Sequence, residues 1–235
     1  MKEYLISAID NYKISLSDEQ IDQLQGYYEM LIEWNQKMNL TAITDPKEVA
    51  IKHFADSLSI FNYIDLPQNA RIIDVGTGAG FPGVVMKIAR PDLELTLLDS
   101  LKKRLVFLES VLNKLGLSSE LIHDRAENAA QNIDLREGFD LAVSRAVARM
   151  NVLSEYCLPF VRLSGHFAAM KGPDAQPEIQ AAKNAIQILG GKIFKINEFE
   201  LYENGGGRTI VLVEKIRPTP EKYPRNSGKI KSNPL

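Results

Sequence analysis

The sequence predicts an α/β fold, in which a doubly wound, mostly parallel sheet is preceded by a helical cap and completed by an antiparallel C-terminal hairpin. From residue 70 onward, short apolar runs alternate with stretches of helical periodicity. The apolar runs are continuous, which is typical of parallel strands that are covered on both faces. The expected parallel strands are residues 71–75, 93–98, 120–123, 139–143 and 166–170.

Residues 1–65 are expected to form the helical cap. Ser17 and Gln20 fit a capping box at the start of a long helix, in which each side chain satisfies a backbone donor of the other residue. Asp45 is expected to cap a second helix, which has a proline in its first turn. A proline-containing turn then separates the cap from the strands. We therefore expect the main domain at residues 66–217 and a basic C-terminal tail at residues 218–235.

The last part of the main domain has a different pattern. Residues 191–202 and 209–216 are rich in β-forming side chains, and they flank the glycine-rich segment 203–207. This pattern predicts an antiparallel hairpin. Among the stretches between the parallel strands, residues 102–115 are the clearest helix, and Gly116 is expected to end it.

Composition and charge exclude several classes of protein. The 235 residues are 45% hydrophobic and 25% charged, which is ordinary for a soluble globular protein, and no apolar run is long enough for a transmembrane helix. A single cysteine and a polar N-terminus favour a reducing, cytoplasmic setting. Three widely separated histidines give no support for a metal site. Because the net charge is −2, any contact with nucleic acid must be local.

A glycine-rich loop follows the first expected strand. Asp74, Gly76, Gly78 and Gly80 are spaced as D-x-G-x-G-x-G, and Phe81 stands where the dinucleotide fingerprint requires its third glycine. An acid here would be unfavourable beside a pyrophosphate, whereas S-adenosylmethionine (SAM) carries a positive sulfur and an ammonium group. The loop is similar to the SAM-binding loop of Rossmann-like methyltransferases. We therefore expect these residues to contact SAM.

Two further acids are candidates for cofactor contacts. Asp99 ends the second expected strand, 25 residues after Asp74, where a carboxylate can accept hydrogen bonds from ribose hydroxyls. Glu127 follows the third expected strand, near the place of an adenine ring. NAD-dependent enzymes share the first feature, and the two acids also suit a solvated strand end and a helix cap. Neither residue decides the cofactor alone.

The motifs extend along nearly the whole chain. They are WNxxMNLTAI at residues 34–43, HFxDSL at 53–58, DVGTGAGFPG at 74–83, DS at 99–100, RAE at 125–127, SRAVA at 144–148, MKG at 170–172, GR at 207–208 and YPR at 223–225. This combination resembles the glucose-inhibited division protein B family, also called RsmG. Members of this family are bacterial methyltransferases that modify guanine N7 in 16S ribosomal RNA, in a hairpin loop near the decoding centre.

The resemblance implies a cofactor, a substrate and a set of contacts. The cofactor would be SAM, and the substrate would be 16S ribosomal RNA, a 30S subunit or an assembly intermediate, with a monomer favoured. The chain departs from the family after residue 225, where NSGKIKS replaces a proline-rich stretch but keeps basic residues. Carried over by position, the SAM contacts fall on Gly76, Phe81, Ala126, Glu127 and Arg145.

The residues agree with attack by guanine N7, which carries a lone pair and no proton. No general base is needed, so catalysis would depend on positioning. Arg145, after the fourth expected strand, is our candidate catalytic residue, because a guanidinium can bond the guanine carbonyl or a phosphate. The tetrapeptide of amino-methylating enzymes is missing at this place. Cys157 lies in an apolar segment, which favours packing over nucleophilic catalysis.

Substrate RNA is expected to contact basic residues near the end of the chain and around the sheet. Residues 215–235 contain six lysines or arginines and one acid, a local charge of +5. We expect removal of residues 221–235 to weaken RNA binding while leaving SAM binding intact. His53, Asp56 and Ser57 share a helix face and could border the SAM pocket, but local pairing of Asp56 explains them equally well. The expected RNA contacts are Lys171, Arg149, Arg208, Arg225, Lys229 and Lys231.

Three other functions stay open on the sequence. A SAM methyltransferase that acts on a small molecule or a protein fits the glycine loop and Asp99 equally well. An NAD-dependent oxidoreductase is disfavoured by the spacing of the glycines. A non-catalytic SAM-binding or RNA-binding module of the ribosome would need the same residues, because N7 methylation requires no acid–base group.

Overall fold

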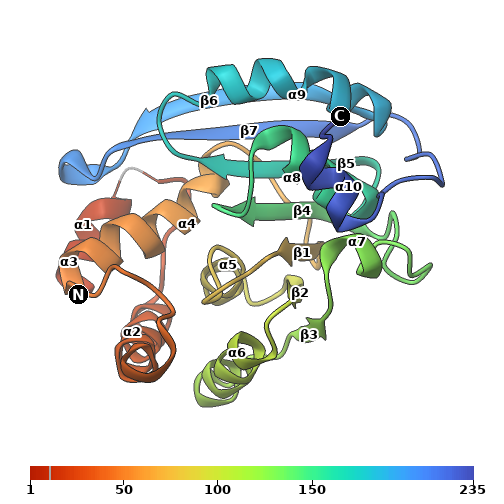
Figure 1. Ribbon diagram of the computed structural model, residues 1–235. Helices are drawn as coiled ribbons and strands as arrows, with labels where there is room; N and C mark the ends of the chain where they lie inside the picture. Colours follow the sequence, from red (N-terminus) through yellow and green to blue (C-terminus); the bar gives the residue numbers. More distant parts are fainter. Residues whose placement is uncertain (11) are drawn as a thin grey trace.

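The computed structural model describes residues 1–10 and 12–235, and it confirms the predicted fold class. Residue 11, which belongs to the expected cap, lies outside the described residues. One sheet has the strand order β3-β2-β1-β4-β5-β7-β6 (Figure 1). The strands are β1 Arg71–Val75, β2 Glu94–Asp99, β3 Glu120–His123, β4 Phe139–Arg145, β5 Val161–Lys171, β6 Gly191–Glu200 and β7 Gly207–Lys215.

The direction of the strands follows the sequence pattern. β1 to β5 are parallel, and β7 runs antiparallel between β5 and β6, as the predicted hairpin requires. β5 begins at Val161 instead of residue 166, because Val161 pairs with Phe139 before the register shifts. The strand order reverses at β1 and β4, so the loops after these two strands border one crevice, the usual place for a ligand in this kind of sheet.

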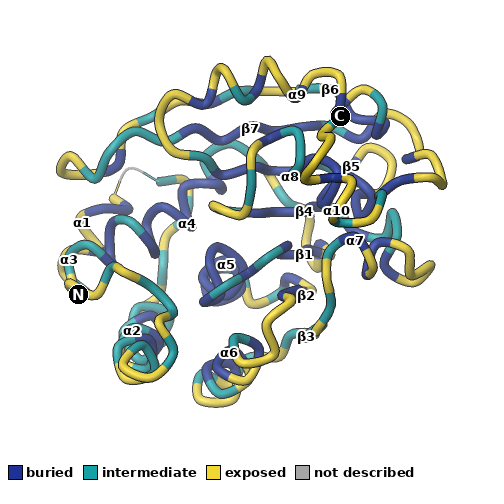
Figure 2. The backbone as a smooth tube through the Cα atoms, viewed as in Figure 1, coloured by how far each residue is buried: buried dark blue, intermediate teal, exposed yellow. Residues whose placement is uncertain are grey.

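Helices cover both faces of the sheet (Figure 1), and the sheet separates two hydrophobic cores. Ile72 packs into the core under the cap, whereas its neighbour Ile73 packs into the core on the opposite face. Figure 2 shows the central strands as buried backbone, which agrees with their continuous apolar sequence. The helices are α1 Lys2–Ile9, α2 Asp18–Met38, α3 Pro46–Val49, α4 Asp56–Leu58, α5 Gly83–Ala89, α6 Lys102–Leu115, α7 Ala126–Ala129, α8 Met150–Cys157, α9 Gln176–Ile188 and α10 Ser227–Ser232.

The cap shares its core with the sheet. Its long helix α2 begins with the predicted capping box, in which Ser17 and Gln20 each accept a backbone hydrogen bond from the other. Trp34 of α2 packs against Phe107 of α6, with 5.6 Å between the ring centroids. The cap is therefore held to the main domain by aromatic packing.

The second helical stretch of the cap differs from the single α-helix that the sequence predicts. Asp45 caps it as expected, but α3 continues through a π-helical turn, Ala50–Ala55, before α4 begins. Turns of this kind are rare and recur at functional sites. Here the turn contains His53 and ends next to Asp56, and both side chains are buried.

The C-terminal segment, residues 218–235, is anchored on the second face of the sheet. Ile230 of α10 is fully buried, and Arg225 pairs with the buried Glu155 of α8. Arg136 donates hydrogen bonds to the carbonyl groups of Thr219 and Tyr223. The segment thus occupies a fixed position next to α8 (Figure 1).

Candidate functional site

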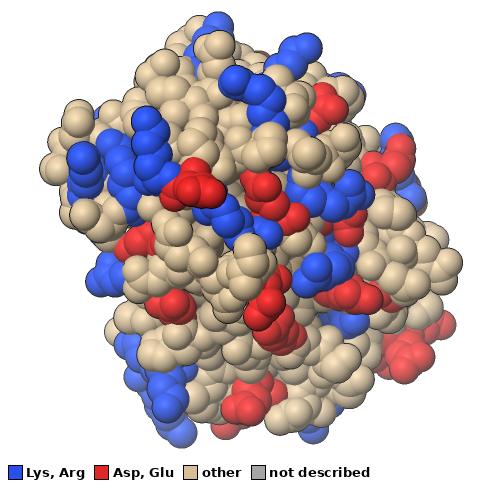
Figure 3. Space-filling view, turned by 90° about the vertical axis from the view of Figure 1, so that its right-hand side faces the viewer, with Lys and Arg blue, Asp and Glu red and all other residues tan. Residues whose placement is uncertain are grey.

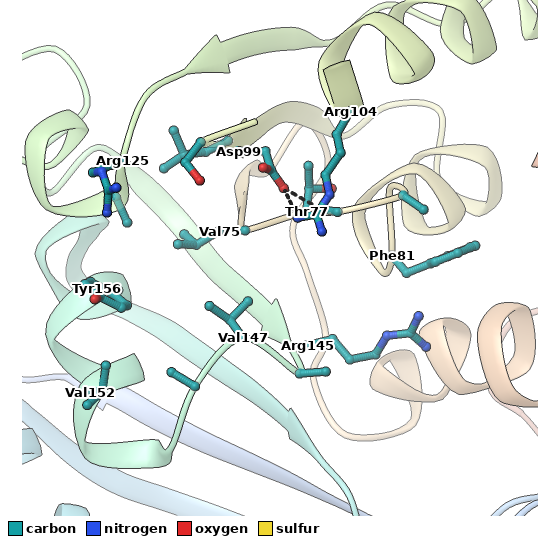
Figure 4. A pocket seen from close by; sticks show the side chains of 18 of the residues that line it. Val75, Thr77, Phe81, Asp99, Arg104, Arg125, Arg145, Val147, Val152 and Tyr156 are labelled. Atoms are coloured by element: carbon teal, nitrogen blue, oxygen red, sulfur yellow. Dashed lines mark hydrogen bonds and ion pairs between the residues drawn. The ribbon is translucent and has the colours of Figure 1, made fainter. Parts of the chain in front are cut away.

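A cavity of about 900 Å³ opens at the carboxyl ends of β1, β2 and β4 (Figure 4). This volume lies in the upper part of the range for small-molecule sites. We call the part formed by Gly76, Gly78, Asp99, Ala126 and Glu127 the sheet end of the cavity. The part formed by Leu40, Thr41, His53, Phe81 and Arg145 is the cap end.

The glycine loop needs its glycines for two different reasons. Gly76, Gly78 and Gly80 have φ angles of 72°, 62° and 96°, a region that other residues rarely adopt. A Cβ on Gly76 would lie only 2.7 Å from a methyl carbon of Val147. A Cβ on Gly78 would meet nothing closer than the Gly76 carbonyl oxygen at 3.9 Å, so Gly78 leaves open space beside the backbone.

Asp74 lies beneath the glycine loop and does not line the cavity. Its Oδ2 accepts hydrogen bonds from the Thr77 hydroxyl at 2.7 Å and from the Gly83 N–H at 2.9 Å. Complete burial raises the pKa of Asp74 to about 6, although both hydrogen bonds oppose this shift. Asp74 therefore holds the loop from behind through Oδ2, whereas its buried Oδ1 has no hydrogen-bond partner among the described residues. The direct SAM contact of Asp74 stays a prediction.

Gly80 likewise lies behind the loop. A Cβ at this position would collide with the hydroxyl of Tyr27, which donates to the carbonyl of Ala79. Tyr27 belongs to α2 and is fully buried. The cap helix thus fixes the far side of the glycine loop, and Gly80 is required for that close approach.

Asp99 faces the cavity from the end of β2. Its Oδ1 accepts from the Leu101 N–H at 2.8 Å, and its Oδ2 accepts from the Gly78 N–H at 2.9 Å and from Arg104 at 3.2 Å (Figure 4). A carboxylate can accept about four hydrogen bonds. One position on Oδ1 is therefore open, although the residue is only 2% exposed.

Ala126 and Glu127 begin α7, after β3, and both line the cavity. Glu127 is buried, and its Oε1 has no hydrogen-bond partner among the described residues. The nearest cation, on Arg125, is 3.9 Å away, which is too long for a hydrogen bond. A buried carboxylate oxygen without a donor is costly, so this atom is suited to a donor on a ligand.

Arg145 ends β4 and extends toward the cap, next to Phe81 (Figure 4). Its Nη1 donates to the Lys52 carbonyl and to Asp56 Oδ2, each at 3.0 Å, and its guanidinium carbon lies 5.0 Å from the centroid of the Phe81 ring. Asp56 is also 3.2 Å from Arg208 of β7, but Oδ1 of Asp56 lacks an aligned hydrogen bond, so this second contact is an ion pair only. The sequence-based suggestion that Asp56 pairs locally is replaced by a pairing with β4 and β7.

His53 lies next to Arg145, and both residues line the cap end of the cavity. Its ring stacks on Phe81, with centroids 4.6 Å apart, and its Nδ1 is 3.2 Å from Nη2 of Arg145. Burial and the charge of Arg145 lower the pKa of His53 to about 3. His53 is therefore neutral at physiological pH.

The six basic residues predicted to contact RNA fall into two groups. Lys171 pairs with Glu178 at 2.7 Å and donates to the Ala148 carbonyl, which fixes the loop after β4. Arg208 and Arg225 also have internal acidic partners, as described above. Exposed side chains remain at Arg149, Lys229 and Lys231.

Charge on the surface is mixed. On the side that lies at the right of Figure 1, Figure 3 shows basic and acidic side chains interspersed. Lys231 and Pro234 also line the cavity. The expectation that removing residues 221–235 leaves SAM binding intact therefore no longer follows, because this segment contributes to the wall of the cavity.

Several lining residues were not identified from the sequence. Thr77 holds Asp74, Arg104 pairs with Asp99, and Val147 and Tyr156 supply apolar wall. Thr77 lies within the glycine motif and Thr41 within the WNxxMNLTAI motif, so the motifs contained a signal for both. The others come together only through the sheet order.

Three further features bear on the sequence expectations: the single cysteine, clusters of metal-binding side chains and membrane-spanning helices. Cys157 is fully buried, and burial raises the pKa of its thiol well above its ordinary value. Within residues 1–10 and 12–235, no cluster of histidine, cysteine and acidic side chains is arranged to hold a metal ion. In the same residues, no helix is both long and apolar enough to cross a membrane.

The fold and its cavity define a class of protein. A methyltransferase from Pyrococcus furiosus superposes with a TM-score of 0.55 at 16% identity, covering 83% of this chain and 98% of that one. A SAM-dependent methyltransferase from Aquifex aeolicus superposes with a TM-score of 0.55 at 18% identity, covering 76% and 97%. The chain therefore has the Rossmann-like methyltransferase fold.

Sequence relatives narrow the class to a family. The sequence model of the family described as rRNA small subunit methyltransferase G matches residues 20–204. Ribosomal RNA small subunit methyltransferase G of Geobacillus sp. (strain WCH70) is 50% identical over 230 residues, which cover 97% of each chain. The protein of the same name from Desulforamulus reducens is 47% identical over 225 residues, covering 95% of this chain and 94% of the relative. The chain belongs to the rRNA small subunit methyltransferase G family.

Proposed function

We propose that this protein transfers a methyl group from SAM to N7 of a guanine in 16S ribosomal RNA, in the cytoplasm. One observation carries the proposal: a single cavity joins two ends of opposite hydrogen-bonding character, in a chain of the rRNA small subunit methyltransferase G family. The sheet end offers carboxylate acceptors, and the cap end offers guanidinium and hydroxyl donors. These ends suit a methyl donor and a purine acceptor respectively.

The sheet end fits SAM. The unpartnered Oε1 of Glu127 suits the amino group of adenine, and the open position on Asp99 suits a ribose hydroxyl. The open space beside Gly78 allows a ligand to approach the backbone. We assign Asp74 and Gly80 to support of the loop from behind. The residues that we assign to the cofactor itself are Gly76, Gly78, Asp99, Ala126 and Glu127 of the sheet end, together with Phe81 and Arg145 of the cap end.

The chemistry that this chain must provide is alignment. SAM, when bound, supplies a methyl group on a positive sulfur, which keeps the bonding electrons as the methyl group moves to N7. Guanine N7 has a lone pair and no proton, so the protein needs no base. We assign the positioning of the purine to Arg145, because its guanidinium is itself held by Asp56, the Lys52 carbonyl and the Phe81 ring.

The RNA backbone would contact the rim of the cavity. Arg149 and Lys231 are exposed and also line the cavity, and Lys229 is exposed on the same short helix as Lys231. We infer that these three side chains make the first contacts with the phosphates of the RNA. We assign Lys171 to holding the loop after β4, Arg208 to holding Asp56, and Arg225 to holding the C-terminal segment.

The test is transfer of a labelled methyl group. The purified protein is incubated with methyl-tritiated SAM and, in parallel, with 16S RNA, 30S subunits and assembly intermediates that lack the modification. The RNA is then digested and its nucleosides are identified. We expect 7-methylguanosine, and the most active of the three RNA forms identifies the substrate. RNA that already carries the modification is the control and should take up no label.

The other outcomes distinguish the remaining functions. If the protein binds SAM but labels none of the RNA forms, the RNA assignment is overturned, and small-molecule or protein acceptors become the leading candidates. Binding of both SAM and RNA without transfer would identify a non-catalytic module. Label on an exocyclic amino group or on carbon would overturn the N7 assignment alone.

A further inference from the structure

Thr41 occupies a fixed position at the cap end of the cavity. Asn39 ends α2 in the left-handed conformation, with a φ angle of 49°, so the chain turns sharply before Thr41. The Thr41 N–H then donates to Oδ1 of Asn35 at 2.9 Å. These two features hold the backbone and leave the side chain at the cavity wall.

The side chain of Thr41 belongs to a chain of hydrogen bonds that begins at Arg145. An arginine can only donate. Its Nη1 serves the Lys52 carbonyl and Asp56, so its Nη2, 3.2 Å from Nδ1 of His53, donates to that nitrogen. Nδ1 of His53 also lies 3.1 Å from the Lys52 carbonyl, which already accepts from Nη1 of Arg145. A proton on Nδ1 would face a hydrogen of Nη2, which has no lone pair to offer, so we assign the proton of the neutral His53 to Nε2.

The protonated Nε2 of His53 lies 2.8 Å from Oγ1 of Thr41 and donates to it. The same oxygen accepts from the Ile43 N–H at 3.0 Å. A hydroxyl has two lone pairs and one proton. Both lone pairs of Thr41 are therefore used, and its proton has no acceptor among the described residues. The network makes Thr41 a donor that cannot accept.

We propose that the Thr41 hydroxyl donates a hydrogen bond to O6 of the target guanine and so selects guanine over adenine; this inference rests on the proposed function. The edge of guanine that carries N7 presents two acceptors, N7 and O6. N7 must keep its lone pair for attack, so O6 is the atom left for recognition. Adenine has an amino donor in the place of O6, and it would meet a hydroxyl that has no free lone pair.

The neutral character of this donor suits the reaction. Positive charge passes from the sulfur to the purine as the N7–carbon bond forms, so a free cation against O6 would oppose the transfer. A hydroxyl does not oppose it, and the charge of Arg145 is compensated by Asp56 at 3.0 Å. Thr41 is therefore a specificity residue, and its removal should act on KM more than on kcat.

The experiment compares two proteins on three RNA substrates. The guanosine mapped by the labelling experiment is replaced in synthetic RNA by inosine, which keeps O6 and N7, or by 2-aminopurine, which keeps N7 but has no O6. For the parent protein, we expect kcat/KM on 2-aminopurine to be about tenfold lower than on guanosine and inosine, beyond their intrinsic reactivity. Thr41→Val should lose about tenfold in kcat/KM on guanosine and inosine, and little on 2-aminopurine.

Two further variants separate recognition from structure. Thr41→Ser keeps the hydroxyl and should keep the discrimination, whereas Thr44→Val makes the same chemical change at an exposed position of the same loop and should change nothing. Equal losses by Thr41→Val on all three substrates would mean that Thr41 only supports the fold, and this would overturn the inference. Unchanged kinetics on guanosine would overturn it as well. If the parent protein forms no 7-methylguanosine, the proposed function fails and the inference fails with it.

Discussion

The sheet end and the cap end of the cavity are formed by different structural features. The sheet end depends on backbone geometry: strand ends, a loop of glycines with positive φ angles, and carboxylates that keep acceptor positions open on Asp99 and Glu127. The cap end depends on side chains, and its groups are arranged in one sequence of donors from Arg145 through His53 to Thr41. The sheet end therefore offers acceptors to the donors of a ligand, whereas the cap end offers donors to the acceptors of a ligand.

This difference shows how one cavity can hold two ligands in a fixed order. SAM presents ribose hydroxyls and amino groups, which suit open acceptors. The reactive edge of guanine presents acceptors, which suit donors. Exchange of the two ligands would leave buried polar groups unpaired at both ends, and such mismatches cost about 1–3 kcal/mol each. The predictions below change one end at a time.

The largest effect is expected from breaking the cap end at Arg145. Arg145→Ala removes the guanidinium that aligns the purine and leaves Asp56 with Arg208 alone. We expect kcat to fall about 100-fold, because small errors of alignment are costly in a transfer without a base. Single-turnover methyl transfer measures this, with SAM affinity from calorimetry and folding from circular dichroism. A folded variant with parental turnover and parental SAM affinity would show that Arg145 has no role in the site.

Breaking the sheet end should change cofactor affinity alone. Asp99→Asn keeps the shape of the side chain but removes its charge and one acceptor. We expect SAM affinity to fall about 10- to 100-fold, the range for losing hydrogen bonds to a charged group. Isothermal calorimetry measures it, and Asp134→Asn, an exposed acid, is the matched control. A comparable loss of RNA affinity in Asp99→Asn would show that the two ends are not separate.

The buried, neutral His53 predicts a pH dependence of stability at the cap end. Below pH 6.5 the unfolded chain takes up a proton on this residue, whereas the folded protein does so only near its pKa of about 3. The free energy of unfolding should therefore fall by about 1.4 kcal/mol for each pH unit from 6.5 downward. Asp74 acts in the opposite direction between 3.8 and about 6, because the folded protein takes up that proton first.

Comparison with His53→Gln removes the contribution of Asp74. The groups that face His53 are Arg145, Arg208, the Lys52 carbonyl and Thr41, and all of them stay in the variant. Urea unfolding of both proteins from pH 5 to 7.5 gives the difference in free energy. The stability advantage of the parent should shrink as the pH falls below 6.5. A difference that does not vary with pH would mean that His53 is not neutral in the folded protein.

The smallest effect concerns the rim, which belongs to neither end. Lys229→Ala combined with Lys231→Ala should reduce the dependence of log RNA affinity on log salt by about one unit for each lost phosphate contact. Filter binding at several salt concentrations measures the slope. The control pair is Lys192→Ala with Lys195→Ala, two exposed lysines on β6. Equal slopes for the two double variants would show that the RNA binds at another surface.

The features that depend on neighbours in sequence could be predicted. The capping box of Ser17 and Gln20, the glycine loop and the acids at the strand ends are defined within a few residues, and the continuous apolar runs identify the central strands. The sheet order then brings Asp99 and Glu127 to the same cavity as the glycine loop. Local patterns therefore predict most of the sheet end.

The features that depend on distant partners could not be predicted. Arg225 was expected to bind RNA, but its partner Glu155 is 70 residues away in sequence. Asp56 meets Arg145 across 89 residues, and the π-helical turn before Asp56 leaves no clear mark in the apolar pattern. A single sequence lists charged residues but does not state which of them neutralise one another, so the donors of the cap end emerge only in three dimensions.

The contact between Trp34 and Phe107 gives the protein an internal optical reporter. Trp34 is the sole tryptophan of the chain, and it lies where α2 of the cap meets α6 of the main domain. Its emission therefore depends on whether the cap stays seated, and no label has to be attached. Any ligand that loosens or tightens the cap would shift this emission, whereas an event confined to the far face of the sheet would leave the emission unchanged.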